Sequence, residues 1–419
     1  MIAVQQIGQK IATEPFPTSV ARRTARIQAL WWDCGSHMPE LGRIYSSAEQ
    51  RAHETRLSGL RERLTAEWKR LPPGAVEQSA ALRERTLDDA FVFLTDTFDF
   101  PAASLDVLRR SGLIEAAEAF ARRARQYDPA ISSADIFQAS RNVMTMNFAQ
   151  LLMGLPVELT PSVFAYSMLY PYTDNYLDDP SVPMQEKAGF NRRFYQRLAG
   201  ERLSPIHAYE ERIWDLVAMV EEQWPRANWP QVYDSLLAIL SAQARSMHQL
   251  RGSVSPYEVD VLGISFEKGG ASVLADGYLV AGALTEEQAD FLFAYGAYTQ
   301  LMDDLEDVDA DRRAGFMTIF SQTAGRWPLD ALTNTAFHMG ARIFGQMERF
   351  PVPEARPLQD LVLRALNPLL SASAAGAARY YTRPYLRALE AHMPLRFAAL
   401  SEQRKKLERA RLPLELFVG

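Results

Sequence analysis

Aspartates gather at two places in this chain, each at the C-terminal end of an apolar stretch with helical spacing. The first place, SMLYPYTDNYLDDP, contains Asp174, Asp178 and Asp179. Because residues four apart lie on the same face of a helix, Asp174 and Asp178 share a face. Like charges at this spacing repel each other, and the C-terminal end of a helix disfavours anions. A bound cation would offset both penalties.

The second place is YTQLMDDLEDVDADRR, which follows the apolar and aromatic segment FLFAYGAYTQLM. Here Asp303, Asp307 and Asp311 form an i, i+4, i+8 ladder on one helix face. Carboxylate oxygens with no His or Cys nearby favour Mg²⁺, which a few carboxylates and substrate phosphates usually hold together. A solvated acidic surface is the alternative interpretation for either cluster alone. The presence of both clusters favours a metal site.

A lysine and two glycines lie between the aspartate clusters, in SFEKGGASVLADGYLVAG. Gly269 and Gly270 directly follow Lys268. Consecutive glycines weaken a helix and expose its backbone groups, so we expect a helix break at this point. Lys268 beside such a break could meet an anion, although an ordinary surface lysine is the alternative.

Composition limits the class of protein. The chain has 419 residues, of which 47% are hydrophobic and 23% are charged, which is ample for a large buried core. A net charge of −6 argues against nucleic acid as a partner. The single cysteine, Cys34, excludes an internal disulfide framework and suits a reducing compartment. No apolar run has the length of a transmembrane helix and no signal peptide is recognised, so we expect a soluble, cytoplasmic protein.

Helical periodicity extends along most of the chain and predicts an all-α protein. No strand-like alternation with hairpin turns is seen. We assign residues 1–128, rich in Arg and Glu, to an N-terminal helical extension, and residues 129–419 to an α-helical domain. The predicted helices are Arg51–Leu71, Ala75–Leu94, Ala103–Arg125, Ala134–Leu152, Pro161–Leu177, Ile206–Glu222, Trp229–Leu250, Val273–Ala281, Glu286–Val308, Leu329–Met347, Leu358–Leu369 and Ala374–Ala391.

The stretch from Lys268 through Gln300, Asp303 and Asp304 to Asp307 resembles the C-terminal half of the trans-isoprenyl diphosphate synthase and class I terpene synthase superfamily. In that superfamily a lysine-centred helix break precedes a Gln-x-x-Asp-Asp-x-x-Asp helix. The first cluster is similar to the D-x-x-x-D-D motif of squalene synthase-like members. The resemblance covers roughly residues 135 to 395. It implies an all-α bundle in which two aspartate-bearing helices face each other across a cavity.

The resemblance also implies a role for each matching residue. Three Mg²⁺ ions would hold the diphosphate of an isoprenyl diphosphate substrate between the two clusters. Lys268 would bind diphosphate oxygens, and the aromatic faces of Tyr170 and Tyr295, each near an aspartate cluster, would stabilise a carbocation. The implied metal ligands are Asp174, Asp178, Asp179, Asp303, Asp304, Asp307 and Asp311. The other implied substrate contacts are Arg141, Arg192, Arg193, Gln300, Arg379 and Tyr380.

Departures from the superfamily motifs indicate which reaction to expect. Chain-elongating members place Arg-Arg-Gly shortly after the first motif, whereas here Arg192 and Arg193 come later and no glycine follows them. No D-x-D-D string for protonation-initiated cyclisation is present. We therefore expect a Mg²⁺-dependent class I terpene synthase that ionises one allylic diphosphate and then cyclises or quenches the carbocation. Head-to-head coupling, as in squalene synthase-like enzymes, is the alternative. A non-catalytic isoprenoid-binding scaffold is a third interpretation, and a homodimer is left open.

Overall fold

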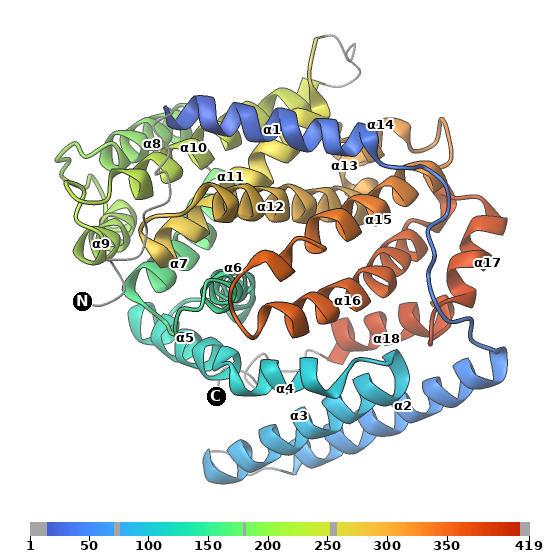
Figure 1. Cartoon of the computed structure of the whole chain (residues 1–419). Helices are drawn as coiled ribbons and strands as arrows, with labels where there is room; N and C mark the ends of the chain where they lie inside the picture. Colours follow the sequence, from blue (N-terminus) through green and yellow to red (C-terminus); the bar gives the residue numbers. More distant parts are fainter. Residues whose placement is uncertain (1–14, 71–75, 179–181, 252–257, 411–419) are drawn as a thin grey trace.

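The computed structural model of this chain describes residues 15–70, 76–178, 182–251 and 258–410, and each regular element in those ranges is a helix (Figure 1). The prediction of an all-α protein is therefore confirmed. The helices of the first half are α1 (Phe16–Asp33), α2 (Ser47–Lys69), α3 (Val76–Phe98), α4 (Ala102–Arg110), α5 (Leu113–Tyr127), α6 (Ser133–Leu152), α7 (Pro161–Asp178), α8 (Met184–Leu198) and α9 (Ala208–Gln223).

The second half continues with helices of similar length and three short 3₁₀ turns. Two of its α-helices, α11 and α12, occupy the middle of the molecule (Figure 1). The elements are α10 (Pro230–Ser246), η1 (Met247–Arg251), α11 (Val261–Ala281), α12 (Glu286–Glu306), α13 (Val308–Ala314), α14 (Ile319–Thr323), α15 (Asp330–Phe344), η2 (Met347–Arg349), α16 (Ala355–Gly376), η3 (Ala378–Tyr380), α17 (Arg383–Ala391) and α18 (Phe397–Ala410).

Most predicted helices match observed ones within a few residues at each end. The larger differences are at Ala103–Arg125, at Val273–Ala281, which is the second part of α11, at Leu358–Leu369, and at Ala374–Ala391, of which Arg383–Ala391 forms α17. The predicted helix Ala103–Arg125 is split into α4 and α5, because Gly112 between them has φ 83°. A left-handed residue of this kind ends a helix, and glycine adopts it without steric strain. Conversely, α16 contains Pro368 in its interior and continues to Gly376, beyond the predicted helix end at Leu369. Helices α1, α8, α13, α14 and α18 were not predicted.

The core is built around the close packing of α11 on α12. A Cβ atom added to Gly269 would collide with the carbonyl oxygen of Gly296, and a Cβ on Gly270 would collide with the ring of Phe293. These glycines therefore allow two helix backbones to touch. The expectation of a helix break after Lys268 is wrong, because α11 runs without interruption from Val261 to Ala281. Burial of the helix on nearly all sides outweighs the low helix propensity of glycine.

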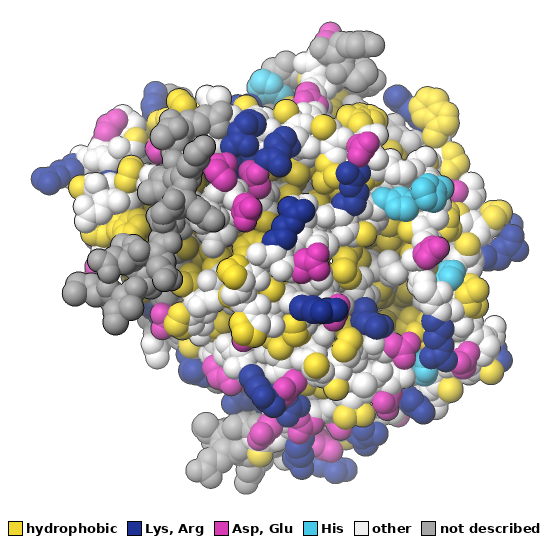
Figure 2. Space-filling model, in the orientation of Figure 1, with side chains coloured by type: hydrophobic (Ala, Val, Ile, Leu, Met, Phe, Trp, Pro, Cys, Tyr) yellow, Lys and Arg dark blue, Asp and Glu magenta, His cyan; other side chains and the backbone are white. Residues whose placement is uncertain are grey.

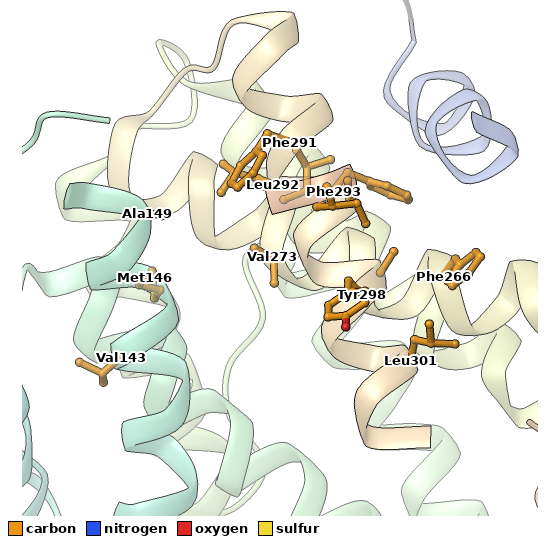
Figure 3. Close-up of a cluster of buried hydrophobic side chains, with 14 of the residues drawn as sticks. Val143, Met146, Ala149, Phe266, Val273, Phe291, Leu292, Phe293, Tyr298 and Leu301 are labelled. Carbon is orange, nitrogen blue, oxygen red and sulfur yellow. The ribbon is translucent and has the colours of Figure 1, made fainter. Parts of the chain in front are cut away.

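Helix α6 supplies another side of this core. Figure 3 shows Val143 and Met146 of α6 in the same buried cluster as Val273 of α11 and Phe293 of α12. All four side chains are almost fully removed from solvent. Burial of each large apolar side chain contributes about 1.5–3 kcal/mol, so α6, α11 and α12 are held in one unit mainly by the hydrophobic effect.

The N-terminal helices do not form a separate layer. Helix α1 packs across α10, α11 and α12, where Trp31 lies 6.4 Å from the Phe266 ring. The core cluster contains residues from both sides of the predicted boundary at residue 128. Helices α2 and α3 form a pair at one edge of the molecule (Figure 1). There α2 is joined to the C-terminal region by an ion pair between Glu54 and Arg396.

Among the described residues, no helix is long and apolar enough to cross a membrane. On the face shown in Figure 2, Lys and Arg side chains alternate with Asp and Glu rather than gathering in an area of one sign.

Candidate functional site

The aspartates of the second cluster keep their helical spacing across a junction. Helix α12 ends at Glu306 and α13 begins at Val308, with Asp307 between them. The backbone N–H of Asp307 donates to the carbonyl oxygen of Asp303 at 2.8 Å, and the N–H of Asp311 donates to that of Asp307 at 2.9 Å. Because these i→i+4 bonds continue, Asp303, Asp307 and Asp311 lie on one side of the α12–α13 segment.

Two of these carboxylates have raised pKa values. Burial raises the pKa of Asp303, Arg141 opposes the shift, and the charge of Asp307 adds to it. Burial, together with the charges of Asp304 and Asp307, raises the pKa of Asp311 to about 7, and Lys268 opposes that shift. The ladder therefore contains repelling groups in a partly desolvated setting, which a cation would stabilise in their ionised form.

Asp304 and Gln300 face inward, unlike Asp303. The Asp304 side chain is buried, with Gln300 Nε2 donating to its Oδ1 at 2.8 Å. Burial raises the pKa of Asp304 to about 6, while hydrogen bonds from Gln300 and Ser265 oppose the shift. Its Oδ2 has no hydrogen-bond partner among the described residues. Asp304 thus lies behind the exposed carboxylates, and Gln300 orients it rather than contacting substrate directly.

Two predicted cations reach the second cluster from neighbouring helices. Arg141 of α6 places Nη2 3.6 Å from Asp303 Oδ1. Lys268 of α11 is close enough for its charge to lower the pKa values of Asp303, Asp304 and Asp311 against the larger effect of burial. Three different helices therefore bring opposite charges together at one end of the bundle.

The predicted Arg-Tyr pair, Arg379 and Tyr380, contacts Asp309, an aspartate of the second cluster that was not among the predicted metal ligands. Tyr380 donates its hydroxyl hydrogen bond to Asp309 Oδ1 at 2.5 Å, and Arg379 forms an ion pair with the same carboxylate. The Arg379 guanidinium lies 4.8 Å from the Tyr380 ring centroid. Burial would raise the pKa of Asp309, but hydrogen bonds from Tyr380 and Arg379 lower it. Arg379 is thus held at Asp309 of α13, and no contact with the aspartates of the ladder is seen among the described residues.

Arg192 and Arg193, the two predicted substrate contacts on α8, have no contact with the aspartate clusters among the described residues. Arg193 donates through Nε to Glu210 Oε1 at 2.7 Å and through Nη2 to Glu210 Oε2 at 2.8 Å. Because Glu210 is buried, this pair stabilises the α8–α9 packing, and the Arg193 guanidinium is already committed there. Arg192 is exposed on α8. We therefore withdraw Arg193 as a predicted diphosphate contact.

The first aspartate cluster is only partly within view. Asp174 and Asp178 lie in the last two turns of α7, and the structure describes their backbone but not their side chains. Asp179 lies outside the described residues. One turn earlier, Tyr170 is 44% exposed although it follows a buried stretch of the same helix. The α7 backbone thus leads from a buried N-terminal half to this aspartate end.

Exposure falls steadily along one face of each of four helices that pack around a common space. On α12, Asp303 is half exposed, Tyr295 is partly buried and Leu292 is fully buried. On α11, Lys268 is partly buried and Asp276 is fully buried. The corresponding series are Arg141, Thr145, Phe148 and Leu152 on α6, and Tyr170, Tyr166 and Val163 on α7.

Cross-helix contacts show that these faces meet at matching depths. The Arg141–Asp303 pair joins α6 to α12 at the exposed end, and the rings of Phe148 and Tyr295 lie 5.6 Å apart further in. Burial raises the pKa of Tyr295 to about 12 even though the side chain keeps some solvent access. Along each of these faces the side chains change from exposed to buried. We call this arrangement of four helix faces the α6–α12 recess, with the charged, exposed ends as its mouth and the buried ends as its floor.

The donor chemistry of the mouth suits Mg²⁺ in part. Asp303 and Asp307 offer hard oxygens on one side, and Mg²⁺ typically takes one or two carboxylates and completes its shell with water and phosphate. Within the described ranges, no three His, Cys, Asp or Glu side chains form a group that could hold an ion. The side chains of Asp174 and Asp178 lie outside the description, so the expected Mg²⁺ site stays a prediction.

One residue that the sequence analysis missed stands out. Asp276 lies two turns beyond Lys268 on the same face of α11 and is only 1% exposed. A signal was available, because Asp276 is the single charged residue in the apolar run ASVLADGYLVAG. Its position in the recess could not be read from the sequence, since it depends on the packing of α6 and α12 around it.

No protein-family model, curated protein or solved structure matches this chain. The functional interpretation therefore rests on the residues of the recess. Their arrangement combines a charged mouth, an aromatic wall and a closed floor, which is the layout needed to hold a molecule with an anionic head and an apolar tail.

Proposed function

We propose that this protein is a Mg²⁺-dependent class I terpene synthase, which ionises an allylic isoprenyl diphosphate and releases diphosphate. The observation that carries the proposal is the convergence of Lys268 and Arg141 on the Asp303–Asp307–Asp311 ladder at the mouth of the recess. Repelling carboxylates beside two cations are expected where metal ions and a polyanionic substrate bind together. A scaffold that binds only an apolar molecule has no need of this charge pattern.

The first step that the site would assist is breakage of the allylic C–O bond. Lys268 and Arg141 would bind the diphosphate oxygens and stabilise the negative charge that grows as the bond lengthens. Arg379, which pairs with Asp309 on α13, would have to leave this ion pair to bind the same anion. When bound at the aspartates, Mg²⁺ would supply Lewis-acid stabilisation of the leaving group. Asp304, fixed by Gln300, would keep the ladder in position.

The lower recess would shape and protect the resulting carbocation. Tyr295 is surrounded by Phe148, Phe291 and Phe344, whose ring centroids lie 5.6, 6.4 and 5.7 Å from its own. Aromatic faces attract a cation by about 0.5–2 kcal/mol each, and more where water is excluded. On α6, Met144 flanks Arg141 one turn away and is 58% exposed, so an apolar surface begins directly beside the charged mouth.

The proposal is tested by incubating the purified protein with geranyl, farnesyl and geranylgeranyl diphosphates, with Mg²⁺ or with a chelator. We expect release of inorganic diphosphate from at least one substrate only when Mg²⁺ is present, and products of unchanged carbon number by mass spectrometry. Products of doubled carbon number would instead support head-to-head coupling. No release from any substrate, together with no Mg²⁺-dependent diphosphate binding by calorimetry, would reject catalysis and leave an isoprenoid-binding scaffold.

A further inference from the structure

The floor of the α6–α12 recess contains a carboxyl group that the ionisation step does not use. Asp276 is fully buried, and neither of its oxygens has a hydrogen-bond partner among the described residues. An unsatisfied buried polar group of this kind costs about 1–3 kcal/mol unless another molecule completes its hydrogen bonds. The group therefore has a physical requirement for a small polar partner.

Polar side chains of α6, α7 and α12 lie near the Asp276 carboxyl group. The Asn142 side chain of α6 lies beside Asp276, and its Nδ2 donates to Ser167 Oγ of α7 at 3.2 Å. The hydroxyl of Tyr295 on α12 interacts with Thr145 and is close enough to feel the charge of Asp276. We call Asp276, Asn142, Ser167, Thr145 and Tyr295 the polar floor. They are surrounded by apolar core residues, and the two Asp276 carboxyl oxygens have no hydrogen-bond partner among the described residues.

The protonation state of Asp276 decides what the polar floor can do. Burial raises the pKa of Asp276 well above its ordinary value, and the effect of Asn142 in the opposite direction is smaller. Burial thus favours the protonated form, which has one O–H donor and carbonyl acceptor capacity. A neutral acid cannot combine with a carbocation as an anion would. It can instead hold water, which needs two to four polar partners in a site of this kind.

We propose that the polar floor binds one water molecule that captures the carbocation, so that the product of this protein is a terpene alcohol. This inference rests on the proposed function, because the cation comes from the ionisation at the mouth. A lone pair of the water oxygen forms the C–O bond to the cationic carbon. The extra proton on that oxygen then passes to the released diphosphate, which is the base that the ionisation step supplies. The net change is addition of water, with no oxidation or reduction.

The test follows products in water enriched in ¹⁸O, with Mg²⁺ and the allylic diphosphate that is turned over. We expect the wild-type alcohol to contain one ¹⁸O atom. The Asp276→Leu variant, which cannot hydrogen-bond water, should release diphosphate at a rate within a few-fold of wild type. Its ratio of alcohol to hydrocarbon should fall at least tenfold. If Asp276→Leu does not fold, Asp276→Met is read in the same way, because its flexible side chain fills the same space.

Two further variants separate hydrogen bonding from general disturbance. Asp276→Asn keeps one donor and one acceptor, so it should retain most of the alcohol. Ser272→Ala changes a partly buried hydroxyl one turn above Asp276 and should leave the product ratio unchanged. Wild-type protein that releases diphosphate but forms only hydrocarbon, or an Asp276→Leu variant with the wild-type ratio, would overturn this inference alone. Absence of diphosphate release by wild type would reject the proposed function instead.

Discussion

The mouth and the floor of the α6–α12 recess both contain aspartates, but the two regions treat the carboxyl group in opposite ways. At the mouth, Asp303 and Asp311 are crowded by other carboxylates, and Arg141 and Lys268 partly compensate. At the floor, burial raises the pKa of Asp276 well above its ordinary value, and no cation among the described residues opposes the shift. The same side chain therefore suits an anion-and-metal site at one end and a neutral hydrogen-bonding site at the other. The following predictions test that contrast.

The largest effect is expected at the mouth. Asp303→Asn removes a proposed metal ligand but keeps the shape of the side chain. We expect diphosphate release to fall by about 10²–10³-fold, the size typical for loss of one preorganised electrostatic group. Thermal stability without Mg²⁺ should stay the same or rise slightly, because repulsion from Asp307 is relieved. Steady-state kinetics and a melting curve measure both, and near wild-type turnover would contradict the metal assignment.

The second prediction concerns the cation that faces the ladder. Lys268→Ala should lower the rate of diphosphate release by about 10²-fold, since a positive charge is lost where the leaving group forms. Lys268→Arg should restore part of the rate, because a planar guanidinium is not equivalent to a compact ammonium group. The matched comparison is Lys187→Ala on α8, which should leave the rate unchanged. Equal rates for Lys268→Ala and wild type would return Lys268 to an ordinary surface role.

The third prediction tests how the mouth is held together. Gly269→Ala places a methyl group against the Gly296 carbonyl, so the α11 and α12 backbones must separate. We expect a loss of about 1–3 kcal/mol in the free energy of unfolding, as for overpacked cores, together with lower activity. Gly59→Ala, in α2 with nothing near the added Cβ, serves as the control and should be neutral or stabilising. Denaturant titration distinguishes the two, and equal stability would contradict the close backbone contact.

The smallest effect is a pH dependence of thermal stability that comes from the carboxyl groups at the mouth. The folded pKa values of Asp304 (about 6) and Asp311 (about 7) lie above the unfolded value of about 4. Between these values the folded state binds more protons than the unfolded state, so stability falls as the pH rises. Without Mg²⁺ we expect a melting temperature a few degrees lower at pH 8 than at pH 5, and Asp311→Asn should flatten this dependence. Mg²⁺ should restore the loss at the mouth. An unchanged slope in Asp311→Asn would contradict the raised pKa.

Features that depend on local spacing could be predicted from the sequence, whereas those that depend on packing partners could not. The helical ladder of Asp303, Asp307 and Asp311 follows from i, i+4 periodicity, and the structure keeps that spacing even across the α12–α13 junction. The interpretation of Gly269 and Gly270 as a helix break used local propensity alone. The partner that explains them, Gly296, belongs to another helix.

The same distinction applies to charged residues. Arg193 was a reasonable anion contact by position, but buried Glu210 on the next helix already binds its guanidinium. Helix α1 was missed because its charged face looks solvated in the sequence. In the structure, buried Arg23 pairs with Asp290, which is far away in the chain and lies on α12. An ion pair between distant segments does not change the spacing of residues in either segment, so it cannot be predicted from the sequence pattern.

The backbone contact between Gly269 and Gly296 has a consequence for how this protein can diversify. Since no side chain lies between α11 and α12 at that point, main-chain contact sets the offset of the two helices. Substitutions lower in the recess, at Tyr295 for example, leave the separation of Lys268 and Asp303 unchanged. Selection can therefore alter the contour of the wall, and with it the fate of a bound molecule, while the charged mouth stays constant. Such an architecture lets specificity evolve independently of the chemistry that starts the reaction.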